Sequence, residues 1–400
     1  MARLALTYLA STFSKTRVAI ATTMFNISTV QAFKDSFPTW PQDSLAFRTD
    51  PLGPGSSWDK RELGTFQILR RAPNQELPVF LEAYSIAAAK WVENSQDIRS
   101  ALMLLTRNWR SLTHHELASF AGNFTSFFTL LAQVLETPVS ADPRRELRSQ
   151  NVESSGYPAD SAITSSPPLP PSLPSQPSSP VQPPSKKVRQ YRSSDSYIPS
   201  DQSDQSSHNH RTKSEMTTNA CVYELLRCVT ELLRGESKPR VYLEWSITHD
   251  TFIVEAGKLS YSTTNDGSLV HKAHREGYWQ RASKISYCSI EAKSWHDVDE
   301  KPFKARAQEA AHLVGMYSQY DRTGNILQDD IILLLVSAAQ NVFSLVFGKF
   351  PAQYARYLSD GYQSDDGMFV EIDECGMFEL QEPSDLTRVF TLIVALHLWL

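Results

Sequence analysis

An acid and a lysine stand two residues apart at Glu291 and Lys293, at the end of a β-type run over residues 284–290. Side chains two positions apart in a strand point to the same face of the sheet, so this spacing predicts that the two project together. A carboxylate beside an ammonium can hold a divalent metal and polarise a water, which is the equipment of metal-assisted phosphodiester hydrolysis. The alternative for the same pair is a simple salt bridge along the strand.

Four further acidic residues bear on this pair. Asp266 lies upstream in an Asn-Asp-Gly sequence, where it is either a second carboxylate for the same site or an ordinary turn residue. Asp250 is the alternative first acid, although it falls in a predicted turn. Glu224 and Glu231 lie on a predicted helix opposite its apolar stripe, so we expect both to face solvent.

Composition limits the class of protein. The chain has 400 residues, 41% of them hydrophobic, a formal net charge of −5 and four cysteines without C-x-x-C spacing. These cysteines indicate neither a zinc site nor a disulfide framework. No apolar run approaches the roughly 20 residues of a membrane helix, so no membrane partner is expected.

Composition also divides the chain into three parts. Residues 1–140 are expected to form a mainly helical N-terminal domain of unknown role, with helices at 79–94, 97–109 and 114–136. Asp97 is the expected N-cap of the second helix and Thr113 that of the third. Residues 141–218 are rich in proline and serine and are expected to be a disordered linker. Residues 219–400 form the second folded domain.

The second domain is predicted to have a mixed α/β core in the order α-β-β-β-α-β. Residues 272–281 are expected to be a surface loop before the strand of Glu291. The expected elements are a helix at 222–233, extended runs at 241–247, 252–263 and 284–290, a helix at 303–320, strands at 331–336, 341–347 and 368–372, and a closing helix from Ser384.

Residues 220–400 resemble the PD-(D/E)XK nuclease superfamily, which has the restriction-endonuclease-like fold, and in particular the nuclease-like proteins of filamentous fungi. The resemblance rests on the segments 265–270, 287–293 and 307–311. It implies that Asp266 is the first acid, Glu291 the second and Lys293 the motif lysine, with Gln308 facing the site from the following helix. Asp266 departs from the pattern because no proline precedes it.

The resemblance implies a metal-dependent nuclease acting on nucleic acid, with DNA as the expected substrate. Asp266 and Glu291 would bind Mg²⁺ (or Mn²⁺) through oxygen ligands, and Lys293 would position the water or stabilise developing negative charge. Acidic residues outnumber basic ones in residues 220–400, whereas nucleic-acid binders normally carry a basic surface. The alternative is therefore a catalytically inactive protein of the same fold that acts as a binding or regulatory partner.

Partners and location follow from the less regular parts of the chain. The basic cluster Lys186-Lys187-Val188-Arg189 in the linker is typical of a nuclear import signal, so a nuclear location is expected. A cytoplasmic location remains the alternative, as does a mitochondrial one, because basic residues precede the first acid at Asp35. The N-terminal helices or the proline-rich linker are the expected contacts for a protein partner.

Overall fold

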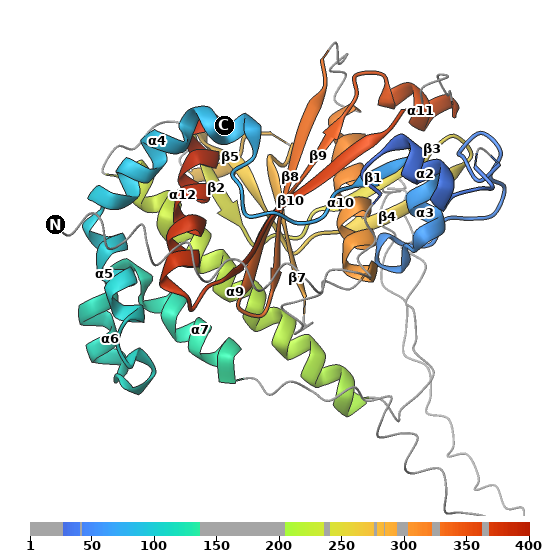
Figure 1. The fold of residues 1–400 in the computed structure, drawn as a ribbon. Coiled ribbons are helices and arrows are strands. Elements are labelled where there is room, and N and C mark those ends of the chain that lie inside the picture. Colours follow the sequence, from blue (N-terminus) through green and yellow to red (C-terminus); the bar gives the residue numbers. More distant parts are fainter. Residues whose placement is uncertain are drawn as a thin grey trace, which may run out of the picture. The chain divides into compact units, whose positions relative to one another are not determined.

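The computed structural model is a mixed α/β protein with one large sheet of eight strands in its described part (Figure 1). It describes residues 27–40, 42–136, 205–235, 241–275, 278–283, 285–293, 303–321, 329–361 and 368–400. The strands of this sheet are β1 (Ile68–Arg70), β2 (Val241–Ser246), β5 (Gly267–Arg275), β6 (Tyr278–Arg281), β7 (Cys288–Lys293), β8 (Ile331–Ala339), β9 (Val342–Phe350) and β10 (Val370–Glu379).

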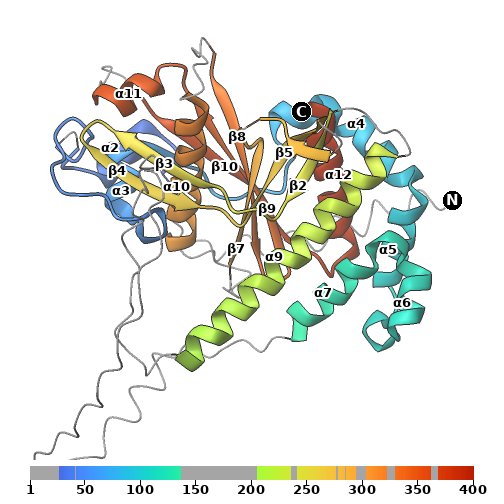
Figure 2. The same cartoon turned by 180° about the vertical axis from the view of Figure 1, so that it is seen from behind.

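Helices cover both faces of the sheet (Figures 1 and 2). One face packs against α4, α7, α9 and α12, and the other packs against α2, α3, α10 and α11. The α-helices are α2 (Val30–Ser36), α3 (Lys60–Thr65), α4 (Val79–Asn94), α5 (Gln96–Leu105), α6 (His114–Ala121), α7 (Thr125–Glu136), α9 (Gln205–Arg234), α10 (Phe303–Asp321), α11 (Tyr354–Asp360) and α12 (Pro383–Trp399).

The strand order is β1-β10-β9-β8-β7-β5-β2, with β6 paired to β5. Strands β2, β5 and β7 pair antiparallel, whereas β7 and β8 are parallel. Parallel neighbours need a crossover connection, and α10 supplies it here. This crossover places α10 on the sheet face toward which the end of β7 projects Glu291.

Two expectations for the segment before β7 are wrong. Residues 252–263 do not form one extended run but a separate hairpin of β3 (Thr251–Ala256) and β4 (Leu259–Thr264). The chain reverses between Ala256 and Leu259, where Gly257 takes a φ of 58° that favours glycine. Residues 272–281 are not a loop either, because β5 and β6 pair across them.

The N-terminal part does not fold as a body of its own. Strand β1 pairs in parallel with β10, and α4 packs against α12 in a shared hydrophobic core. The described residues within 1–139 and 209–400 accordingly form one compact unit. Helix α4 has the expected bounds, but Ser95 rather than Asp97 caps α5. Thr113 caps α6 as expected, and Glu116 completes a capping box with it.

The expected linker lies almost wholly outside the described residues, together with its proline tract and its basic cluster at Lys186 to Arg189. Helix α9 begins at Gln205, inside the range 141–218 that the sequence assigned to the linker. The helix that was predicted at residues 222–233 is therefore longer than expected, and it begins earlier, at Gln205.

Of the described helices, those over His114–Glu136 are together long and apolar enough to cross a membrane by length and composition. Helix α6 ends at Ala121, and Gly122 has a φ of 54° before α7 begins. Phe124, Phe127 and Phe128 of this segment are buried in the core that α12 also lines.

Candidate active site

Glu291 and Lys293 share one face of β7, as the strand period predicts, and their side chains form an ion pair. Glu291 is only 2% exposed, and the ammonium of Lys293 contacts its Oε1 atom. The two neighbours of Glu291 in the strand, Ile290 and Ala292, point to the opposite face, where Ile290 belongs to the hydrophobic core and Ala292 is buried. Strand alternation therefore delivers a buried carboxylate and its lysine to the face that α10 covers.

Asp266 lies directly beside this pair. Its Oδ2 atom accepts a 2.7 Å hydrogen bond from the backbone nitrogen of Ala292, the residue between Glu291 and Lys293. Its own backbone nitrogen donates to the oxygen of Ile290 at 2.9 Å. The Asn-Asp-Gly sequence is thus not a free turn but the point where the chain enters β5 against β7.

The neighbours of Asp266 explain its fixed position. Asn265 donates from Nδ2 to Ser289 Oγ at 3.0 Å, and Asn219 of α9 donates to the backbone oxygen of Asp266 at 2.9 Å. A Cβ atom on Gly267 would lie 2.7 Å from the backbone oxygen of Ser246, closer than real Cβ atoms approach. Glycine at this position lets β2 and β5 close together beside the acid.

Helix α10 contributes two side chains to Glu291. Gln308 donates from Nε2 to Glu291 Oε1 at 2.8 Å, which is the contact expected for a helix residue facing the site. One turn later, Nε2 of His312 lies 3.1 Å from the other carboxylate oxygen, Oε2. The sequence analysis did not identify His312, although it stands four residues after Gln308 and therefore on the same helix face.

Burial determines the charge states here. It raises the pKa of Glu291 to about 7, in spite of the Lys293 ammonium that favours the ionised form. Burial and the charge of Glu291 also raise the pKa of Asp266. Burial would lower the pKa of Lys293, but the adjacent Glu291 carboxylate outweighs it and raises that pKa. Burial lowers the pKa of His312 to about 3, so this imidazole is neutral at pH 7.

Helix α9 provides an acid that the sequence analysis missed. Burial and the nearer charges have the largest effects on the pKa values of Glu291 and Lys293, and the charge of Glu215 raises both pKa values further. The Glu215 carboxylate therefore lies close enough to act on the site electrostatically. The acids considered instead, Glu224 and Glu231, both pair with Arg227. Placing the linker boundary at residue 218 had removed Glu215 from the predicted helix.

The alternative first acid, Asp250, has a structural role. Its carboxylate forms a 2.6 Å ion pair with Arg281 and accepts hydrogen bonds from Ser268 at 2.9 Å and Ser286 at 2.8 Å. Burial alone would raise the pKa of Asp250, but these partners outweigh it and lower that pKa. Asp250 therefore ties the start of β3 to β5 and leaves the site to Asp266.

The donor set fits a hard divalent cation bound with few protein ligands. No group of three His, Cys, Asp or Glu side chains within the described ranges stands close enough to enclose a metal by itself. Mg²⁺ is usually bound by one or two carboxylates, with waters and substrate phosphates completing its shell. Asp266 and Glu291 meet that requirement, and Oε2 of Glu291 is buried without a hydrogen-bond partner in this part of the chain.

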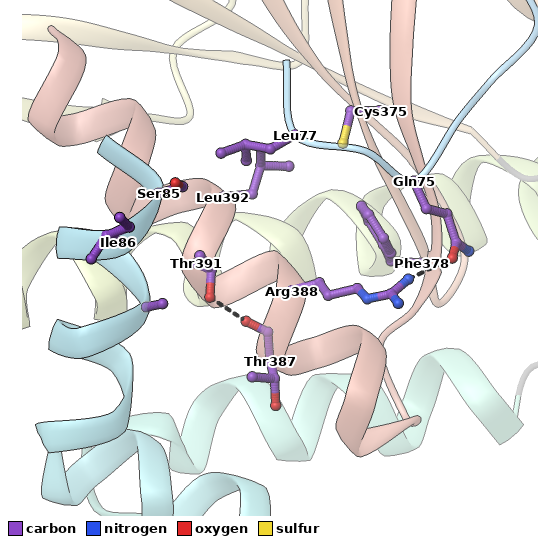
Figure 3. A pocket seen from close by; sticks show the side chains of 11 residues that line it. Gln75, Leu77, Ser85, Ile86, Cys375, Phe378, Thr387, Arg388, Thr391 and Leu392 are labelled. Carbon is purple, nitrogen blue, oxygen red and sulfur yellow. Dashed lines mark hydrogen bonds between the residues drawn. The ribbon is translucent and has the colours of Figure 1, made fainter. Parts of the chain in front are cut away.

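A pocket of about 450 Å³ lies on the other face of the sheet, between α4 and α12 (Figure 3). At the edge of this pocket, the Arg388 side chain donates a hydrogen bond to Gln75. The residues that line the pocket include no carboxylate. Thr387, Thr391 and Ser85 each donate their hydroxyl to a backbone oxygen of their own helix. This pocket is mainly apolar, and it has no carboxylates that could bind a metal ion as Asp266 and Glu291 could.

Comparison with known proteins adds no family to these observations. The chain matches no model in a scan of protein families, and it matches none of the curated proteins searched. The functional conclusion therefore rests on the residues around Glu291 and on their chemistry.

Proposed function

We propose that this protein is a metal-dependent nuclease that hydrolyses phosphodiester bonds, with DNA as its substrate, and that its core is a restriction-endonuclease-like fold. The order α9-β2-β5-β7-α10-β8 supports this fold, with the β3–β4 hairpin as an insertion. One observation carries the proposal. The Asp266 carboxylate is hydrogen-bonded to the backbone nitrogen between Glu291 and Lys293, so two acids and a lysine converge from two adjacent strands.

Each side chain has a part in the hydrolysis. Asp266 and Glu291 would hold the metal, which when bound offsets the charge of the scissile phosphate and lowers the pKa of a coordinated water. Gln308 fixes the orientation of the Glu291 carboxylate through Oε1. Lys293 stays charged at neutral pH and would orient the attacking water or stabilise the negative charge that develops on the phosphate.

The test uses the full chain and measures cleavage of single- and double-stranded DNA and RNA with Mg²⁺ or Mn²⁺. Glu291→Gln and Lys293→Met should each lower kcat by about 100-fold or more, since each removes a charge that acts on the reacting phosphate. Glu255→Gln and Lys258→Met are the matched controls, because both side chains are exposed on the β3–β4 hairpin and the same charges are removed.

Cleavage that persists unchanged in Glu291→Gln and Lys293→Met would refute this assignment of the site. If the folded wild type cleaves none of these polymers with either metal, the inactive binding protein becomes the better reading of the same fold.

A further inference from the structure

The pocket between α4 and α12 has a mainly apolar lining. Its volume of about 450 Å³ lies within the range of small-molecule pockets in proteins. The apolar side chains come from α4, β10, α12 and the segment just before α4, and they are Leu77, Ile86, Ala89, Phe378 and Leu392. The pocket therefore offers a surface that a hydrocarbon group can cover.

The polar groups of this pocket differ in what they leave available. The hydroxyls of Ser85, Thr387 and Thr391 already donate to backbone oxygens of their own helices. Arg388 donates to the neutral amide of Gln75 at 2.5 Å, and no carboxylate within the described ranges pairs with it. A guanidinium carries five N–H donors, so the remaining donors of Arg388 can still bind an anion.

The charged group and the most exposed apolar group lie at opposite ends of the pocket. Figure 3 shows Arg388 extending from α12 to Gln75 at one end. Ile86 of α4 lies at the other end, and the side chains of Leu77 and Leu392 lie between the two ends. Ile86 is 83% exposed, so a molecule that covered it would gain the free energy of burying its apolar surface.

We propose that this pocket binds an unbranched alkyl chain with a terminal carboxylate, as in a fatty acid. The carboxylate would accept hydrogen bonds from Arg388, because the planar fork of a guanidinium matches the two oxygens of a carboxylate. The alkyl chain would lie along the apolar lining and cover Ile86. The lining provides one guanidinium and no second cation, which favours a singly charged head group over a phosphate.

This inference does not rest on the proposed function, because the pocket and Glu291 lie on opposite faces of the sheet. Isothermal titration calorimetry of the full chain with decanoate tests it, and decanoate should bind as one molecule per chain. Hexanoate should bind at least about 10-fold more weakly, since each buried methylene is worth roughly 4-fold in affinity. Decan-1-ol has the same chain without the charge, and it should bind about 5-fold more weakly than decanoate.

Two variants with matched controls locate the ligand. Arg388→Gln should weaken decanoate binding by about 5-fold and remove the preference over decan-1-ol. Its control is Arg99→Gln, because Arg99 is also exposed and donates to a glutamine, Gln96, but lies on α5 outside the pocket. Ile86→Ser should weaken the binding of both ligands by about 3-fold or more. Its control is Val79→Ser, because Val79 is 80% exposed on the same helix and does not line the pocket.

Several outcomes would overturn the proposal. Decanoate that fails to bind the folded wild type would refute it, and equal affinities for decanoate and decan-1-ol would refute the role of Arg388. Unchanged binding in both Arg388→Gln and Ile86→Ser would show that the ligand binds elsewhere. All four substituted positions are exposed, so the variants are expected to fold.

A photoreactive benzoylphenylalanine in place of Ile86 tests whether protein fills the pocket instead. Crosslinks to another segment of this chain, or to a second copy of it, would refute a fatty-acid site. Crosslinks to added decanoate would support one. None of these measurements uses cleavage of nucleic acid, so the two proposals can fail independently.

Discussion

The side chain of Glu291 is almost fully buried and contacts Lys293, Gln308 and His312. It is buried on β7, it contacts Lys293, and its pKa is raised to about 7. Burial of a carboxylate without enough compensating partners favours the protonated form. In the absence of a bound ion, this residue therefore changes charge close to neutral pH.

This raised pKa predicts a specific pH dependence of stability. A carboxyl with a higher pKa in the folded state binds more protons when folded, so its contribution to stability falls as pH rises from about 4.5 to about 7. Glu291→Gln cannot titrate. Its free energy of unfolding relative to the wild type should therefore improve across this window, by an amount of the order of 1–3 kcal/mol.

The measurement is urea unfolding of the metal-free protein at pH 5.0 and pH 7.5. Glu255→Gln serves as the control, because it makes the same substitution at an exposed position of the β3–β4 hairpin. A constant difference for Glu291→Gln would contradict the raised pKa.

Among the residues of the site, the sequence predicted those whose positions follow from the two-residue period of a strand. Glu291 and Lys293 follow from the strand period, whereas Gln308 was expected only because the resemblance implies a glutamine that faces the site from the following helix. Glu215 and His312 were not predicted. The first lies inside a helix whose polar beginning resembles a linker, and the second resembles any histidine until the fold buries it beside Glu291.

At the scale of elements, a buried ion cluster fixes β1 in the sheet. Arg70, which is 1% exposed, pairs with Glu309 of α10 at 2.6 Å and with Glu374 of β10 at 2.9 Å. Ser337 of β8 also donates to Glu309. Glu309 follows Gln308 on α10, so the same cluster holds the helix that contacts the site.

Arg70→Met should destabilise the protein by about 3–5 kcal/mol, because it removes a buried cation that pairs with two buried carboxylates. Arg71→Met is the neighbouring control. That arginine is about half exposed and pairs with Glu371 and Asp373, so its loss should cost no more than about 1 kcal/mol. Chemical denaturation of both variants measures the two free energies, and equal losses would contradict this account.

Elements with a long apolar period were predicted well from the sequence, and those that depend on pairing were not. Helices α4, α10 and α12 follow directly from their apolar spacing. The β3–β4 hairpin was read as one run because alternation continues on both sides of Gly257. Strand β1 has three residues and is held by Arg70 and β10, which no local pattern reveals.

At the scale of the whole molecule, two distant parts of the chain complete one sheet and share its cores. Ile68 pairs with Val370, and α4 packs on α12, while the segment between α7 and α9 lies outside the described residues. Each part alone would leave apolar surface uncovered. Neither part is therefore expected to be stable without the other.

A protease site inserted into residues 141–204 tests this interdependence. After cleavage, the two pieces should elute together in size-exclusion chromatography under native conditions and separate only in denaturant. A version with the site inserted after residue 400 controls for the protease itself. Pieces that separate under native conditions would show that the N-terminal part is a domain of its own.

The long-range partnership of Arg70 also sets the order of events during synthesis. Arg70 is synthesised 304 residues before its partner Glu374. At about 5–20 residues per second, this interval lasts roughly 15–60 s. During that time β1 cannot complete its pairing with β10, and α4 cannot pack on α12. The core that α4 and α12 share can therefore form only after α12 has been made.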